Sequence, residues 1–186
     1  SSKHVLYRAS EKASRLLLGR VYLHMQEWEN AKNILEPLFG NIALSSLVAG
    51  DTLSEDNRFL NEDNTELIFS QFSQVCWTGN APEFCVSREL YNLYDENDRR
   101  KGCFKKNVDT DSLALLYKYN TGNYQARVSD VLMLRAAEAY LNMAEACAML
   151  GTDDATANKY LNELLRNRIV GYQDQTYTGE ELVKQI

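Results

Sequence analysis

One turn-rich stretch of the sequence holds side chains that could bind a ligand. Residues 76–84 combine Gly, Asn and Pro, which are typical of exposed loops, with Trp77. A sugar ring stacks its apolar face on an aromatic plane, while nearby amides and carboxylates bond its hydroxyl groups. Gln74, Asn80 and Glu83 are the companions that could supply those groups. The alternative is that Trp77 covers the core beneath a loop, and the sequence leaves both interpretations open.

A second polar loop has the same two interpretations. Tyr119 and Tyr124 bracket residues 120–123, so that either ring could contact a ligand or pack on the core. The chain has eleven Tyr, six Phe and two Trp, and most such rings are buried in ordinary proteins. Only their positions in the fold distinguish the two roles.

The acidic side chains do not form a catalytic arrangement. Glu55-Asp56 and Glu62-Asp63 lie in polar stretches that have no apolar neighbours to shift a pKa. The sequence also has no phosphate-binding loop, no nucleophile elbow and no zinc-protease helix motif. We therefore expect a chain that is not an enzyme and needs no cofactor.

Metal binding has equally little support. The four cysteines, Cys76, Cys85, Cys103 and Cys147, lack C-x-x-C spacing, and the histidines are His4 and His24. The loop aspartates Asp98, Asp109 and Asp111 match no calcium-loop spacing and are interpreted as turn residues. We predict no metal site. Whether Cys76 and Cys85 form a disulfide or stay free is left open.

Composition indicates a chain that folds into a compact unit. The net charge of -6, without a basic stripe, argues against nucleic acid as a partner. No apolar run approaches the roughly 20 residues that a membrane span needs. Apolar residues make up 45% of the chain, which is enough for one compact core.

Two helices are predicted at the start of the chain, over residues 5–25 and 29–39, with a stop at Gly40. The apolar stripe of the first helix is Leu6, Ala9, Ala13, Leu17 and Val21, and that of the second is Ala31, Ile34, Leu35 and Leu38. The spacing of Gly19, Tyr22, Ala31 and Leu35 is typical of a tetratricopeptide hairpin. Its small residues let the two helix backbones approach.

A second hairpin is predicted near the other end. Residues 130–150 form one helix, Gly151 ends it, and residues 155–168 form its partner. The packing positions are Ala144, Ala157, Tyr160, Leu161 and Leu164. Along the first helix, Arg135, Glu138, Asn142 and Glu145 recur every three or four residues. We interpret this polar stripe as scaffold whose charges pair internally.

The region between the hairpins is irregular. After the acidic stretch 51–64, a strand is predicted over 66–72, a helix capped by Ser87 over 87–94, and a second strand over 115–119. Past the second hairpin, Thr178 and Glu181 form a capping-box pattern that announces a further helix. Because this helix has barely begun at Ile186, we expect the chain to be part of a longer protein.

The order of these segments resembles the SusD/RagB family of outer-membrane nutrient-binding lipoproteins. The segments that carry the resemblance are 13–31, 64–69, 89–94 with 98–100, 118–120, 130–146 and 161–168. The resemblance implies a tetratricopeptide-like scaffold, to which Arg135, Glu138 and Glu145 belong. It also implies a location on the outer face of the outer membrane, through a lipid anchor that this chain lacks. The implied activity is to bind a glycan or other nutrient and to pass it to a SusC-like, TonB-dependent transporter.

We therefore expect a mainly α, SusD-like α-α superhelix with a small irregular insert containing short strands. The expected single domain has a hairpin over 1–40, the insert over 41–127, a hairpin over 128–170 and the start of a further helix over 171–186. The alternative function is a tetratricopeptide adaptor that holds peptide segments of a partner protein. The insert with Trp77 favours the nutrient-binding interpretation, because an adaptor keeps a regular array.

Overall fold

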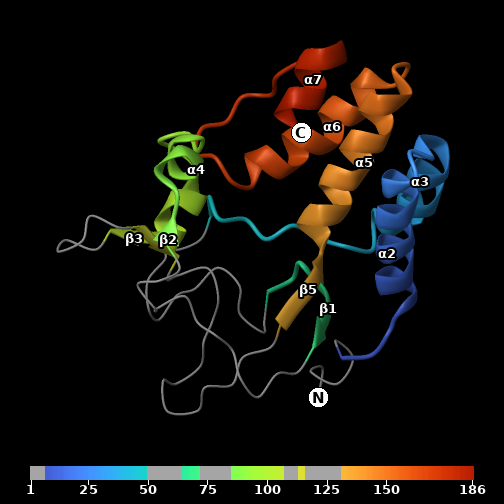
Figure 1. Cartoon of the computed structure of the whole chain (residues 1–186), viewed down its shortest axis with the longest axis horizontal. Helices are drawn as coiled ribbons and strands as arrows, with labels where there is room; N and C mark the ends of the chain where they lie inside the picture. The colour runs from blue at the N-terminus through green and yellow to red at the C-terminus, as the bar shows by residue number, and fades with distance from the viewer. Residues whose placement is uncertain (1–6, 50–63, 72–84, 107–112, 116–130) are drawn as a thin grey trace.

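The chain forms a mainly helical body beside a smaller mixed body (Figure 1). The computed structural model describes residues 7–49, 64–71, 85–106, 113–115 and 131–186. The helices of the main body are α2 (Glu11–His24), α3 (Trp28–Leu35), α5 (Ala136–Leu150), α6 (Asp154–Arg166) and α7 (Gly179–Gln185). The predicted mainly α architecture is confirmed. Among the described residues, no helix combines the length and the apolar character needed to cross a bilayer.

The first predicted hairpin is present as α2 and α3. Ser10 caps α2, because its hydroxyl accepts a hydrogen bond from the Ala13 N–H at 3.2 Å. The helix therefore begins at Glu11 and not at residue 5. The two helices approach closely as predicted, since a Cβ added to Gly19 would lie only 2.6 Å from Leu35 Cδ2.

The predicted apolar stripe of the first helix is wrong in part. Leu17 and Val21 are 50% and 44% exposed, whereas Leu16 is fully buried. The contact of Gly19 with Leu35 decides which face of α2 turns inward, and it selects positions 13, 16 and 19. Ala9 is exposed as well, because it precedes the helix, and Leu6 lies outside the described residues. The predicted stripe of α3 is confirmed, with Ala31 and Leu35 at 0% exposure.

The second predicted hairpin is α5 and α6. Gly151 ends α5 in the left-handed conformation, with φ of 67°, as its place in the sequence predicts. The packing positions Ala144, Ala157, Leu161 and Leu164 are buried, and Tyr160 packs against them. Phe39 joins the two hairpins, because its ring contacts Tyr160 at 4.4 Å and Tyr140 at 5.0 Å between centroids.

The helix predicted over 130–150 is wrong at its start. Residues Val131–Arg135 form strand β5, which pairs antiparallel with β1 (Leu67–Gln71), and the helix begins at Ala136. Leu134 is buried and Met133 is 48% exposed, which is the alternation of a strand. Residues 131–135 form a strand and not a helix, because β1 pairs with their backbone N–H and C=O groups. The Ala136 N–H continues this pairing by donating to the Glu66 carbonyl at 2.8 Å.

The smaller body contains α4 (Arg88–Asn92), the 3-10 helix η2 (Arg99–Cys103) and a three-stranded antiparallel sheet. The strands are β2 (Cys85–Val86), β4 (Leu113–Leu115) and β3 (Phe104–Lys106), in the order β2-β4-β3. The Ser87 cap is confirmed, since its hydroxyl accepts from the Leu90 N–H. The second predicted strand begins at residue 113 rather than 115, because it pairs with both neighbours from that point; residues 116–119 lie outside the described part.

Helix α7 begins where the sequence predicts, but without the predicted capping bond. Thr178 occupies the N-cap position, and its side chain makes no capping hydrogen bond. The extended segment before α7 is held instead by α6. Asn162 donates to the Gln175 carbonyl and accepts from the Gln175 N–H, and Asn158 does the same with Tyr177. Leu182 of α7 then completes the common core at 0% exposure.

Candidate functional site

The ligand-binding residues predicted from the sequence lie outside the described residues. Gln74, Trp77, Asn80 and Glu83 fall in 72–84, and Tyr119 and Tyr124 fall in 116–130. The same holds for Cys76, the acidic pairs of 55–63, Asp109 and Asp111. These residues stay a prediction. Their neighbours in the sequence are described, because 72–84 joins β1 to β2 and 116–130 joins β4 to β5.

Asp98, one of the aspartates interpreted as turn residues, caps the 3-10 helix η2, because its carboxylate accepts from the Arg100 N–H at 2.8 Å. It is 3% exposed, and both carboxylate oxygens accept hydrogen bonds from Arg100. The Arg100 guanidinium lies in turn over the Tyr94 ring, at 5.1 Å from its centroid. No group of three His, Cys, Asp or Glu side chains gathers among the residues that the structure describes.

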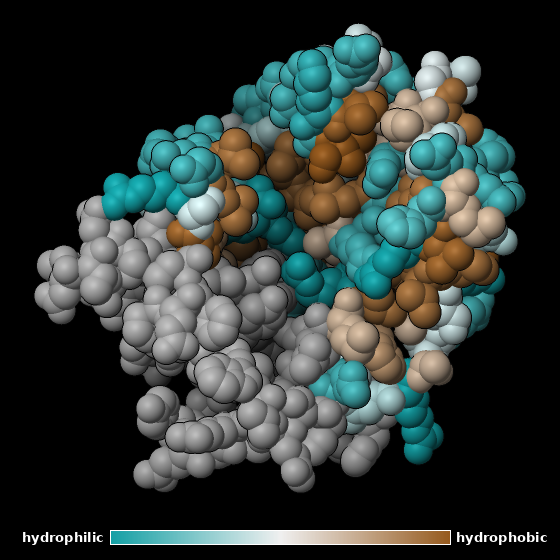
Figure 2. All heavy atoms as spheres, viewed as in Figure 1, coloured by the Kyte–Doolittle hydropathy of each residue, from teal (hydrophilic) through white to brown (hydrophobic). Residues whose placement is uncertain are grey.

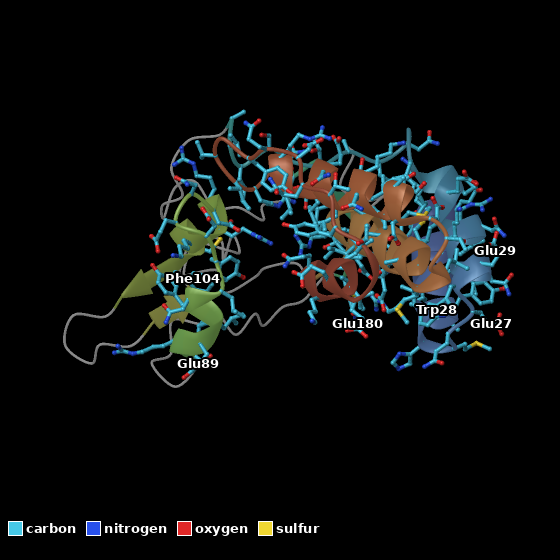
Figure 3. The ribbon with its side chains drawn as sticks, turned by 90° about the horizontal axis from the view of Figure 1, so that it is seen from above. Glu27, Trp28, Glu29, Glu89, Phe104 and Glu180 are labelled. Carbon is cyan, nitrogen blue, oxygen red and sulfur yellow. The ribbon has the colours of Figure 1, made fainter. Side chains whose placement is uncertain are left out.

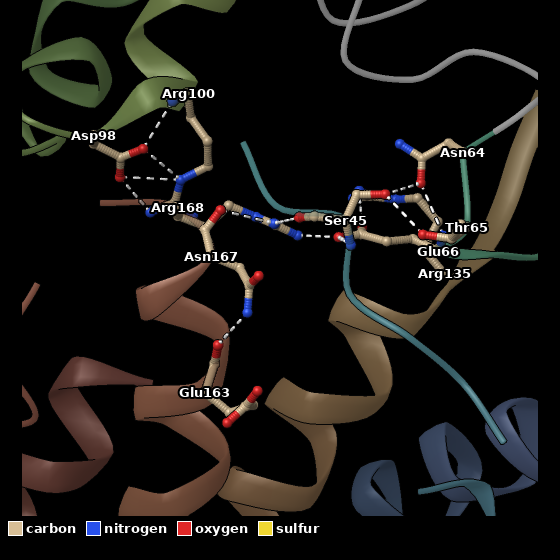
Figure 4. A network of polar contacts seen from close by, with 10 residues as sticks. All are labelled: Ser45, Asn64, Thr65, Glu66, Asp98, Arg100, Arg135, Glu163, Asn167 and Arg168. Carbon is tan, nitrogen blue, oxygen red and sulfur yellow. Dashed lines mark hydrogen bonds and ion pairs between the residues drawn. The ribbon is translucent and has the colours of Figure 1, made fainter. Parts of the chain in front are cut away.

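A buried ion pair joins the main body to the strands. Glu66, just before β1, and Arg168, just after α6, are 0% and 2% exposed. The Arg168 Nη2 group donates to Glu66 Oε1, which also accepts from the Ser45 N–H at 2.9 Å (Figure 4). Arg168 Nη1 donates to the Ser45 carbonyl. Two charges this deep in a protein require such partners, since an unpaired buried charge costs several kcal/mol.

Backbone contacts at the end of α6 tie the smaller body to this ion pair. The Arg168 carbonyl accepts from the Arg99 N–H at 2.9 Å, and the Val170 N–H donates to the Asn97 carbonyl at 3.0 Å. Asp98 pairs with Ile169 in the same short antiparallel bridge. Residues 167–170 are therefore the junction between the two bodies.

Arg135 belongs to the same network and not to the polar stripe predicted on the helix. It is the last residue of β5, and its Nη1 lies 3.4 Å from Glu66 Oε2. The predicted internal pairing of the stripe's charges is present at Glu138, which accepts hydrogen bonds from Arg20 of α2 at 2.8 and 2.9 Å. Glu145 is exposed. The Nδ2 of Asn142 is buried and has no hydrogen-bond partner within the described part of the chain.

Burial sets the electrostatics of this network. Loss of solvent lowers the pKa of Arg168 from its usual value, and Glu66 opposes that shift. The positive charges of Arg100 and Arg135 act in the same direction as burial. The network thus contains the guanidinium groups of Arg100, Arg135 and Arg168. Its carboxylates are those of Glu66 and Asp98.

A pocket lies where the two bodies face each other. Its volume is about 250 Å³. The apolar side chains that line it include Val86, Leu90, Tyr94, Phe104, Leu141 and Leu164. Arg100, Arg135 and Arg168 supply its polar wall. Figure 2 shows apolar side chains facing a hollow between α4 and the helices α5 and α6, and Figure 3 places Phe104 on the smaller body, far from Trp28 of α3.

Sequence reasoning missed this pocket. Its walls come from segments that are far apart in the chain, and no short motif joins them. The signal that existed was indirect: Arg168 closes the last of the segments that resemble the SusD/RagB family, and Arg100 lies in another. Glu66, the acidic centre of the network, lies in the resembling segment 64–69, where the sequence predicts the first residue of a strand.

Comparison with known proteins agrees with this architecture. The model of the SusD family matches residues 99–186. None of the curated proteins compared with the chain matches it. A SusD-like carbohydrate binding protein from Bacteroides vulgatus has a TM-score of 0.72 and 20% identity, over 96% of this chain and 41% of its own. A SusD superfamily protein from Bacteroides thetaiotaomicron has a TM-score of 0.70 and 22% identity, over 93% and 45%.

A third similar structure is the surface glycan-binding protein A from Bacteroides uniformis. Its TM-score is 0.64 and its identity 16%, over 97% of this chain and 46% of its own. This chain thus spans less than half the length of these relatives. The SusD family model thus matches the carboxy-terminal part of this chain, and the fold of the chain is similar to that of SusD-like proteins.

Proposed function

We propose that this protein binds a glycan at the cell surface and is not itself an enzyme. The observation that carries the proposal is the SusD-like fold over nearly the whole chain, joined to the SusD family match of residues 99–186. Two of the similar structures are a carbohydrate binding protein and a surface glycan-binding protein. A pocket lined by aromatic and polar side chains is compatible with such a ligand.

The ligand residues that we propose remain Trp77, with Gln74, Asn80 and Glu83, and the pair Tyr119 and Tyr124. A ring of the glycan would stack on Trp77, and the amides and carboxylate would bond its hydroxyl groups. What supports this choice is the residue chemistry of the two segments. Both are also anchored at their ends by described strands.

Affinity electrophoresis of the purified protein against a panel of polysaccharides tests this function. We expect at least one polysaccharide to retard the protein and Trp77→Ala to abolish most of the retardation. The matched control is Trp28→Phe, in the helical hairpin away from the smaller body. Migration unchanged by every polysaccharide, together with tight binding of a peptide, would favour the adaptor and contradict the proposal.

We further propose that the protein acts on the outer face of the outer membrane, beside a SusC-like, TonB-dependent transporter to which it delivers the ligand. The support is the SusD family match of residues 99–186. Purification of the tagged protein from membranes of the organism that encodes it, in mild detergent, should recover such a transporter in comparable amount. Recovery of the protein in the soluble fraction, without any transporter, would contradict this part of the proposal.

A further inference from the structure

The pocket between the two bodies has an unusual wall for a site that binds only neutral sugars. Arg100, Arg135 and Arg168 all line it, and each comes from a different segment of the chain. The only carboxylates hydrogen-bonded to these guanidinium groups, among the described residues, are Glu66 and Asp98. Within the described part of the chain, the polar wall therefore combines three guanidinium groups with two carboxylates.

The three arginines differ in how many of their donors are already used. Arg100 commits Nε and Nη2 to Asp98, and Arg168 commits both Nη groups to Glu66 and Ser45. Arg135 makes a single hydrogen bond among the described residues, to Glu66 at the long distance of 3.4 Å. Its side chain is 26% exposed. Most of the Arg135 donors are thus open to a ligand.

Both carboxylates already accept hydrogen bonds from other donors. Glu66 Oε1 already accepts from Ser45 and Arg168, and Oε2 accepts from Arg135. Both oxygens of Asp98 are held by Arg100. A guanidinium with spare donors beside a partly apolar cavity favours a planar anion, because a carboxylate accepts two parallel N–H bonds from it.

The apolar part of the lining fits a ring. Tyr94 and Phe104 lie with centroids 5.6 Å apart, and Leu90 and Leu141 complete the apolar surface. A volume of about 250 Å³ lies just below the roughly 300 Å³ at which pockets for larger ligands begin, so that one sugar ring is a suitable size. The pocket therefore combines a surface for a ring with donors for an acidic group.

We propose that this pocket binds a uronic acid residue, with the carboxylate of the sugar on Arg135 and its ring against Tyr94 and Phe104. The proposal rests on the proposed glycan-binding function and deepens it, because it assigns the class of glycan: one that contains acidic sugars. Arg168 holds the acidic partner Glu66 in place.

Calorimetric titration of the purified protein with matched sugars tests the assignment. The probes are glucuronate and galacturonate, each against the neutral sugar of the same configuration, glucose and galactose. One charge-assisted hydrogen-bond pair contributes about 1.5–3 kcal/mol, so at least one uronate should bind roughly tenfold or more tightly than its neutral match. Equal affinity for acidic and neutral sugars would overturn the proposal.

Two variants locate the binding. Arg135→Gln should weaken uronate binding about tenfold or more, whereas Arg20→Gln, which removes one arginine charge from α2, should leave it unchanged. Since Arg135 also contacts Glu66, a second variant, Leu90→Trp, fills the pocket from the half-exposed surface of α4 and leaves the ion pairs in place. Uronate binding that survives both Arg135→Gln and Leu90→Trp would place the acidic sugar elsewhere.

The outcome separates this inference from the function on which it rests. Retardation by neutral polysaccharides that depends on Trp77, without any preference for uronates, would refute the acidic-sugar assignment and leave glycan binding standing. Failure to bind any polysaccharide would refute the proposed function, whatever the free uronates do.

Discussion

Glu66 and Arg168 form a buried ion pair although 102 positions separate them in the chain. Glu66 enters the strand pair β1–β5, and Arg168 lies at the end of α6, where the smaller body joins the helices. Because Glu66 and Arg168 connect three parts of the chain, the ion pair helps to fix how the two bodies on either side of the pocket are placed.

Breaking this ion pair on one side should destabilise the protein strongly. Arg168→Met leaves the Glu66 carboxylate buried without its main partner, and we expect the free energy of unfolding to fall by roughly 3–5 kcal/mol. Urea unfolding measures the change. Replacing both partners, in Glu66→Leu with Arg168→Met, should cost less than the sum of the single changes. A control is Arg20→Met in the exposed pair with Glu138, expected to cost below about 1 kcal/mol. Similar losses from Arg168→Met and Arg20→Met would contradict this account.

Gly19→Ala should destabilise the first hairpin, although alanine normally favours a helix by about 1 kcal/mol over glycine. The new Cβ would lie 2.6–3.2 Å from side-chain atoms of Leu35, so that the fully buried Leu35 would have to shift. We expect a net loss of roughly 1–3 kcal/mol. Thermal unfolding of Gly19→Ala, Leu35→Ala and the double variant measures the coupling. The second change should cost less in the presence of the first, and strictly additive losses would show that the two residues do not compete for space.

Stability should depend on pH through Lys32 and Asp153, which join α3 to the start of α6. The hydrogen bond from Lys32 lowers the pKa of Asp153, and the same bond raises the pKa of Lys32. Asp153 therefore contributes to the free energy of unfolding above about pH 4, and this contribution is lost as pH falls through its lowered pKa. Lys32 contributes below about pH 10.4, and its contribution is lost as pH rises through its raised pKa.

Asp153→Asn should therefore lower the free energy of unfolding by less than about 1 kcal/mol at pH 7. This difference between the two proteins should shrink as pH falls from 7 to 3. Urea midpoints of the two proteins, measured side by side across that range, give the dependence. A difference that stays constant with pH would mean that the charge on Asp153 contributes nothing.

Cys147 should be chemically inert in the folded protein. Burial raises the pKa of its thiol to about 12, so that roughly one molecule in ten thousand carries the thiolate at pH 8. Peptide mass spectrometry after iodoacetamide treatment at pH 8 should find Cys147 unmodified in the native protein and modified in urea. Leu93→Cys, at a position that is 81% exposed, supplies a reactive control. Labelling of Cys147 as fast as that control would contradict its burial.

The sequence predicts local features of this fold better than the contacts between distant segments. Gly151 and Ser87 end and begin helices as expected, because these signals depend on a few neighbouring residues. The apolar run 131–134 was assigned to a helix, since only the partner strand β1 distinguishes the two structures. The pairing of Glu66 with Arg168 could not be predicted for the same reason: it depends on how whole elements meet.

The pocket illustrates the same limit for function. A tryptophan in a turn-rich segment, such as Trp77, is locally unusual, whereas Arg100 and Arg135 are ordinary residues until the fold brings them to one pocket. The order of segments along the chain nevertheless predicts the likeness to the SusD/RagB family, and the SusD family match of residues 99–186 agrees with it.

The most direct test of glycan binding is a crystal structure of the protein with an oligosaccharide taken from the polysaccharide that binds it best. We expect one sugar ring stacked on Trp77 and, for an acidic glycan, a uronate carboxylate on Arg135. An oligosaccharide bound only on the outer faces of α2 and α3, away from both, would contradict the account.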